Sequence, residues 1–151
     1  MKIRSVLFVA LLSLTPAALA ADFGIRAGQY NDAEDEFVGV EMVFDTGVLN
    51  INPNIEYRLA DDITAGTANL DVTFDLGKFS SVTPYVGAGV GVLYVDDDFG
   101  ADETDVVGNL IGGVAFNFAS LKPYAQLKYF RTLEDDDRDS DDFAITIGLR
   151  F

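Results

Sequence analysis

Carboxylates are the main candidates for catalysis or metal binding in this 151-residue chain, because the sequence contains neither His nor Cys. Asp71 and Asp75 lie four positions apart in a segment that alternates apolar and polar residues, so both would project from one face of a strand. Paired carboxylates can act as a general acid and a general base. However, Arg26, Arg58 and Arg150 fall on the polar faces of other segments, and a salt-bridge network explains these carboxylates more simply. We therefore predict no catalytic residues and no enzymatic activity.

Acidic runs offer a second kind of chemistry, the binding of a divalent cation. Carboxylates at alternate positions suit a hard cation such as Ca²⁺ or Mg²⁺. The run at 134–142 does not match an EF-hand, because Ser140 stands where that loop requires Gly and Thr146 stands at its twelfth position. The alternative is a solvated charged loop, which is what acidic runs commonly form. We expect no dedicated metal site and no cofactor, and the candidates for weak cation binding are Asp96, Asp98, Asp135, Asp137 and Asp139.

Three glycines at period two, Gly87, Gly89 and Gly91, invite comparison with a phosphate-binding loop. Their spacing is not that of the dinucleotide-binding fingerprint G-x-G-x-x-G, and no helix is predicted after them. Glycines at alternate positions lie on one face of a strand, where they leave space for larger side chains opposite. We predict that this space, and not phosphate binding, is their role.

Composition and charge narrow the class of protein further. The length allows one domain with a modest core. A formal net charge of −15 disfavours nucleic-acid binding, because phosphate contacts require a basic patch. Without Cys and His the chain has no disulfides, no His-based triad and almost no means of holding zinc or haem.

Residues 1–20 have the organisation of a secretory signal peptide. Lys2 and Arg4 precede an apolar run, and Ala18-Leu19-Ala20 forms a small-residue cleavage site. The run is too short for a transmembrane helix, since Pro16 ends it early. We predict a mature domain of residues 21–151, whose formal charge is −17 because two positive charges leave with the signal.

The mature chain alternates apolar and polar residues in eight segments, and no helical period competes with this pattern. Most segments approach the 9–11 residues that a tilted membrane strand needs. The predicted strands are Phe23–Tyr30, Phe37–Asp45, Asn50–Ala60, Ala68–Gly77, Pro84–Val95, Val106–Phe118, Pro123–Thr132 and Phe143–Phe151.

The connections between these segments alternate in charge. The odd ones are acidic and hold 19 of the 25 Asp and Glu residues: Asn31–Glu36, Ala60–Thr67, Asp96–Asp105 and Glu134–Asp142. The even ones are short and nearly uncharged: Asp45–Asn50, Gly77–Thr83 and Ala119–Lys122. In an up-and-down meander these two sets lie at opposite ends, so the sequence predicts a barrel with one acidic end.

Alternation alone does not decide which face is inside, because a soluble lipocalin-like barrel turns its apolar face inward. Two features favour the opposite arrangement, with the apolar face toward lipid. Aromatic residues gather near both ends of the apolar faces, where the two interfaces of a bilayer favour them. The polar faces combine small residues with four positive and four negative charges, which we predict to pair in the lumen: Arg26, Glu41, Glu56, Arg58, Asp71, Asp75, Lys128 and Arg150.

Three stretches give the chain a family resemblance: Thr83–Val92 (TPYVGAGVGV), Leu121–Ala125 (LKPYA) and the Gly148-x-x-Phe151 end. With them the mature chain resembles, along its whole length, the small outer-membrane β-barrel proteins of Gram-negative bacteria, which include the OmpA membrane domain and OmpX. The resemblance implies residence in the cell outer membrane, contact with lipid and lipopolysaccharide, and recognition of Phe151 by the barrel assembly machinery. Lipid A deacylases and omptin-type proteases of this fold use an active-site His, which this chain lacks.

The predicted fold class is therefore all-β, an eight-stranded antiparallel up-and-down transmembrane β-barrel after a cleaved signal peptide. We expect a monomer with a structural or surface-interaction role and acidic loops outside the cell. One alternative is a narrow pore or channel for small hydrophobic molecules, and another is a secreted soluble lipocalin-like binding barrel. Architecture alone does not choose among these roles, because this fold hosts many functions.

Overall fold

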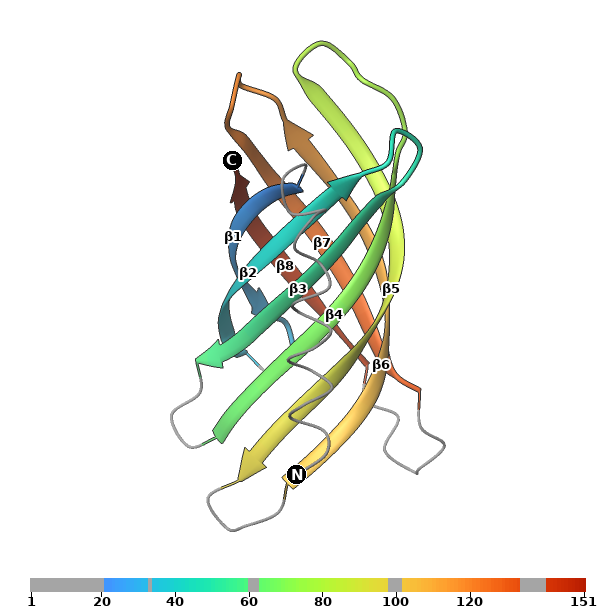
Figure 1. Cartoon of the computed structure of the whole chain (residues 1–151). Coiled ribbons are helices and arrows are strands. Elements are labelled where there is room, and N and C mark those ends of the chain that lie inside the picture. The colour runs from blue at the N-terminus through green and yellow to red at the C-terminus, as the bar shows by residue number, and fades with distance from the viewer. Residues whose placement is uncertain (1–20, 33, 60–62, 98–101, 134–140) are drawn as a thin grey trace.

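The structure is a computed structural model that describes residues 21–32, 34–59, 63–97, 102–133 and 141–151. These residues form a closed barrel of antiparallel strands in which each strand pairs with its neighbours in sequence (Figure 1). The strands are β1 (Ala21–Tyr30), β2 (Glu36–Asp45), β3 (Asn50–Leu59), β4 (Ile63–Asp75), β5 (Val82–Asp97), β6 (Asp102–Phe116), β7 (Lys122–Thr132) and β8 (Asp141–Arg150). Within this part of the chain no helix is long and apolar enough to cross a bilayer. The predicted eight-stranded up-and-down barrel is confirmed, while residues 1–20 lie outside the described residues and their cleavage stays a prediction.

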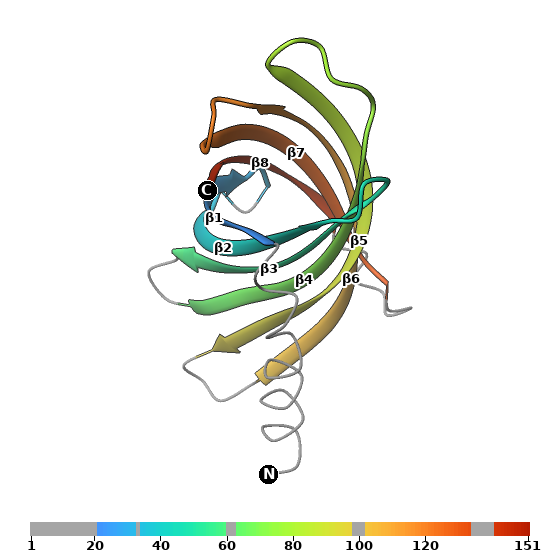
Figure 2. The ribbon, with the colours of Figure 1, turned by 45° about the horizontal axis from the view of Figure 1, so that its top comes forward.

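The first and last strands close the barrel. β1 pairs with β8 from Gly24 opposite Arg150 to Tyr30 opposite Ala144, and Figure 2 shows the resulting ring. Phe151 extends the seam, since its N–H donates to the Phe23 carbonyl at 2.8 Å and the Phe23 N–H donates back at 3.1 Å. Closure leaves no unpaired sheet edge, which is the condition for crossing hydrocarbon with strands.

The apolar side chains point outward and the polar ones inward. Leu110, Ile145 and Ile147 are each at least 60% exposed, whereas Arg26 and Lys128 are no more than 3% exposed. A water-soluble barrel would show the opposite pattern. The inverted arrangement predicted from the sequence is therefore confirmed.

Several strands are longer at the acidic end than the sequence predicts. β5 and β6 continue to the pair Asp96–Asp102, so most of the connection predicted at Asp96–Asp105 is strand. β4 likewise begins at Ile63, within the connection predicted at Ala60–Thr67. No Pro or Gly interrupts residues 102–107, and neighbouring strands supply the partners that local charge patterning does not reveal. The prediction that these two segments are loops is wrong.

The even connections are tight, and they lie together at the upper end of the barrel in Figure 1. Gly47 adopts φ +86°, a left-handed conformation that favours glycine. Its N–H donates to the Asp45 side chain at 2.7 Å, and the Thr46 hydroxyl donates to the Leu49 carbonyl at 2.8 Å. β6 ends at Phe116, short of the predicted Phe118, because Phe118 pairs with Leu121 inside the next turn.

The three period-two glycines of β5 face the lumen and provide space, as the sequence indicates. A Cβ atom on Gly89 would collide with the Asp71 carboxylate, and one on Gly91 would collide with the Asn69 amide. Asp71 and Asn69 lie on β4 directly opposite these glycines. The glycines therefore let the polar side chains of β4 lie across β5 and reach the interior.

Lumenal aromatic rings use glycines in the same way. The Tyr85 ring occupies the space above Gly113 of β6, and the Tyr124 ring occupies the space above Gly148 of β8. Each ring lies close to a glycine of a neighbouring strand, so large side chains fit into a narrow barrel.

Replacing Gly89 by Ala is expected to lower the free energy of unfolding by about 1–3 kcal/mol, because the added methyl group overpacks against Asp71. Gly112→Ala is the matched control, since a Cβ there meets no atom within 4 Å. Urea unfolding of both variants in detergent micelles measures the difference. Equal stability of the two variants would contradict the conclusion that Gly89 leaves space for Asp71.

Candidate functional site in the barrel lumen

Glu56 of β3 is the centre of a charge network in the lumen, and it is completely buried. Lys128, on the opposite wall, donates to both of its carboxylate oxygens at 2.7 and 2.8 Å. A guanidinium nitrogen of Arg26 lies 3.2 Å from Oε1, and the Tyr30 hydroxyl donates to Oε2 at 2.8 Å. Thr67 adds a contact at 3.2 Å. One carboxylate thus joins β1, β3, β4 and β7.

Glu41 of β2 is a second carboxylate with two cationic partners. Arg150 Nε donates to Oε1 at 2.9 Å, and Arg26 Nη1 lies 3.6 Å from Oε2. The Asn52 amide completes the shell at 2.8 Å. Arg26 therefore lies between Glu41 and Glu56 and links both carboxylates into one network.

Asp71 is held differently. Its carboxylate accepts hydrogen bonds from the Asn54 amide at 2.8 Å and the Asn109 amide at 3.1 Å, and the described ion pairs do not include it. Asn69 joins the amides by donating to Asn54 at 3.0 Å. These asparagines were not predicted to be part of the site, and the sign in the sequence that could have found them is their position on the polar faces of the strands.

Arg58 lies apart from this network, near the acidic end. Its guanidinium carbon is 4.0 Å from the centre of the Tyr30 ring and 5.9 Å from that of Phe130. Its ion-pair partner is Asp35, at 3.9 Å. A buried apolar cluster surrounds this position and closes the lumen there: Tyr30, Phe37, Val107, Phe130 and Ala144. The predicted pairing of Arg58 within the central network is not what the structure shows.

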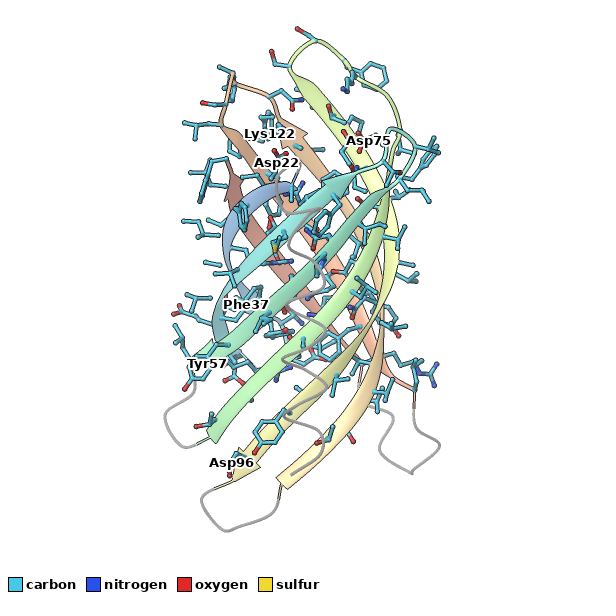
Figure 3. All side chains as sticks on the ribbon, in the orientation of Figure 1. Asp22, Phe37, Tyr57, Asp75, Asp96 and Lys122 are labelled. Carbon is cyan, nitrogen blue, oxygen red and sulfur yellow. The ribbon has the colours of Figure 1, made fainter. Side chains whose placement is uncertain are left out.

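Asp75 also lies outside the central network, near the opposite end. It accepts a hydrogen bond from the Asn50 amide at 3.0 Å. Figure 3 shows Asp75 in this upper region together with Asp22 and Lys122, which form an ion pair with each other. The sequence analysis missed that pair because Asp22 and Lys122 belong to strands that meet only through β8.

Side chains of the described residues leave two small spaces in the lumen. A void of about 10 Å³ lies among Tyr30, Arg58, Lys128 and their neighbours, which is about the volume that one water molecule needs. A cavity of about 80 Å³ lies at the even-turn end, lined by Asp22, Asp75 and Lys122 among others. Between them the Glu56 and Glu41 clusters fill the barrel.

The candidate cation ligands fall mostly outside the described residues. Asp98, Asp135, Asp137 and Asp139 do so, whereas Asp96 is exposed at the acidic end (Figure 3). Among the residues that the structure describes, no three carboxylates come close enough together to hold a metal ion. Weak Ca²⁺ or Mg²⁺ binding by the acidic connections stays a prediction.

No protein-family model matches the chain, and no curated protein is similar to it. Solved structures are similar in fold. Neisserial surface protein A gives a TM-score of 0.68 at 12% identity, covering 86% of this chain and 94% of that one. The N-terminal β-barrel domain of Pseudomonas aeruginosa OprF gives 0.65 at 13% identity, covering 87% and 96%.

The outer membrane enzyme PagL is also similar, with a TM-score of 0.59 at 10% identity over 86% of this chain and 98% of that one. At these identities the likeness concerns the fold alone. The fold of this chain is that of the small outer-membrane β-barrels.

Glu56→Gln is expected to lower the free energy of unfolding by about 3–5 kcal/mol, because it leaves Lys128 and Arg26 buried beside a neutral group. Asp96→Asn is the control, since it removes the same charge from an exposed position. Thermal and urea unfolding in detergent micelles measure both variants.

A double-mutant cycle then isolates the ion pair. Lys128→Met added to Glu56→Gln is expected to cost less than Lys128→Met alone, because it removes a cation that has already lost its partner. Strictly additive losses would show that Glu56 and Lys128 do not depend on each other.

Proposed function

We propose that this chain is an integral protein of the bacterial outer membrane with a structural or surface-interaction role. The observation that carries the proposal is the combination of an apolar exterior with a filled, charge-paired lumen. Such a barrel is stable in lipid and offers no continuous path through its interior. Recognition would then fall to the outer face and to the acidic end.

Aromatic residues support placement in a bilayer. Tyr57, Tyr94 and Phe143 are exposed near the acidic end, and a second exposed set lies near the even turns: Phe23, Phe118 and Phe151. Trp and Tyr prefer the two membrane interfaces, and girdles of aromatic residues flank the apolar band of transmembrane barrels. Phe44 and Tyr129, also assigned to these girdles from the sequence, are only partly exposed.

The alternatives have less support. A pore needs an open lumen, and the void among Tyr30, Arg58 and Lys128 is only about 10 Å³. A soluble ligand-binding barrel needs an apolar interior, and here Glu56, Lys128 and Arg26 occupy it. Catalysis would need a free reactive group, whereas Glu41, Glu56 and Asp71 are all held by several partners.

The even-turn end would face the periplasm, since β1 begins and β8 ends there (Figure 1). Phe151 is 58% exposed and closes the β1–β8 seam through its backbone. This placement supports the proposal that the barrel assembly machinery recognises its side chain. Outer-membrane lipid and lipopolysaccharide would contact the apolar exterior.

Membrane fractionation and conductance test the proposed function together. We expect the protein in the outer-membrane fraction and no reproducible single-channel steps from purified protein in planar bilayers, because the lumen is packed. A soluble periplasmic protein would overturn membrane residence. Regular conductance steps would favour the pore in its place.

Deletion of Phe151 is expected to reduce the amount of protein in the outer membrane severalfold while leaving its export intact. The truncated chain should still fold in detergent, because the ladder from Gly24 to Tyr30 along β8 remains. Heat-dependent gel mobility and fractionation measure the two effects. Phe151→Tyr, which keeps an aromatic ring, is the control, and normal membrane levels after deletion would contradict the role in assembly.

A further inference from the structure

A large apolar groove runs along the outer face of β1. Its volume is about 920 Å³, in the range of ligand-binding sites. Ala27 is the smallest side chain in the row that crosses this face, between Val38 of β2 and Ile147 of β8. The other outward-facing side chains of the lining are apolar or aromatic on both flanks: Ile25, Val40, Ile55, Tyr57, Pro123 and Leu149. Gly39, Gly148 and the buried residues Arg26 and Tyr124 complete the lining.

Toward the acidic end the groove continues into a second hollow of about 750 Å³ that shares Ala27, Val38 and Ile147 with the first. Here the lining becomes polar through Gln29, Asn31, Glu34 and Glu36. Glu36 lies opposite Gln29 on the outward face, so its carboxylate follows directly on the apolar row. The two hollows therefore form one site with a long apolar part and an acidic mouth.

Hydrogen bonds hold the backbone of the acidic mouth in place, and its side chains are negatively charged. The Tyr30 N–H donates to the Asp35 carbonyl at 2.9 Å, and the Asp32 N–H donates to the Asp142 carboxylate at 2.9 Å, which fixes the turn against β8. Asp35 has an ion-pair partner in Arg58, at 3.9 Å. Glu34 and Glu36 are exposed and have no ion-pair partner within the described ranges.

We propose that this groove binds a cationic amphiphile from the outer leaflet, with the apolar chain along Ala27 and the ammonium group between Glu34 and Glu36. The orientation rests on the proposed function, which places the acidic end outside. The charge of the site favours a cationic occupant, since an anionic lipid head would meet two carboxylates that have no ion-pair partner among the described residues. A second copy of the chain would bring its own Glu34 and Glu36 to the same contact, where like charges repel.

The absence of Trp from the sequence allows a direct measurement. Tyr57→Trp places a single fluorophore in the wall of the groove, and Tyr94→Trp places one on β5, across the barrel. Full-length protein isolated from membranes is reconstituted into phosphatidylcholine vesicles. Quenching is then titrated with bromoalkyl amphiphiles that carry the same chain and an ammonium, a neutral or a sulfate head.

With Tyr57→Trp, half-quenching by the ammonium probe is expected at about fivefold lower concentration than by the neutral probe. Glu34→Gln with Glu36→Gln should abolish this difference. The matched control, Asp96→Asn with Asp105→Asn, removes two charges from β5 and β6 at the same end of the barrel. This control should retain the difference between the ammonium and the neutral probe. Ala27→Leu, which fills the groove, should weaken quenching by both probes.

Equal effects of the two charge-removing pairs would overturn the proposal, because they would show a general attraction to the acidic end. The proposal would also be overturned if the ammonium probe were preferred over the neutral probe equally in the Tyr94→Trp and Tyr57→Trp variants. Loss of preference in Glu34→Gln with Glu36→Gln, at unchanged heat-dependent gel mobility, supports the site. Fractionation separately tests outer-membrane residence, so failure of that proposed function is distinguishable from failure of the groove.

Discussion

The buried contact between Glu56 and Lys128 is the interaction on which the rest of the barrel depends. It joins two residues that are 72 positions apart in the chain and crosses the lumen from β3 to β7. Neither charge is tolerable there alone, since an unpaired charge in such surroundings costs several kcal/mol. The remaining polar side chains complete this arrangement: Arg26 connects Glu56 to Glu41, and amides supply the bonds that ion pairs leave open at Asp71.

The small residues of the barrel follow from this network. Long side chains reach the centre of a narrow lumen only where the neighbouring strand has no side chain in the way. Gly89 makes that space for Asp71, and Gly148 makes it for the Tyr124 ring, over which the Arg150 guanidinium stacks at 4.1 Å. Arg150 in turn reaches Glu41, 109 residues earlier in the chain. The network is therefore completed only when β8 closes against β1, which couples the stability of the charges to closure of the barrel.

The filled lumen is also the reason for proposing a role at the outside of the molecule. The acidic end and the apolar exterior remain the surfaces available to partners. The groove along β1 is where these two surfaces meet, because the small side chain of Ala27 leaves a hollow in the apolar face next to the acidic mouth with Glu34 and Glu36. A barrel of this kind presents a polarity gradient along its outer face, which suits amphiphilic molecules better than purely polar or purely apolar ones.

The strands and their two faces could be predicted from the sequence, because period-two alternation is a local pattern. The placement of the aromatic residues and the paired charges of the polar faces then indicated that the polar face points inward. The sequence identified the lumenal charges as a set but not their partners, and Arg58 and Asp75 proved to lie away from the central network. At the acidic end it also began β4 and β6 too late and ended β5 too early, because pairing with a neighbour extends the strands into residues whose local pattern is acidic. Only the tertiary structure decided these points, since the stagger between strands in a closed barrel sets which side chains lie at the same depth. The same stagger brings Ala27, Val38 and Ile147 into one row and so creates the groove.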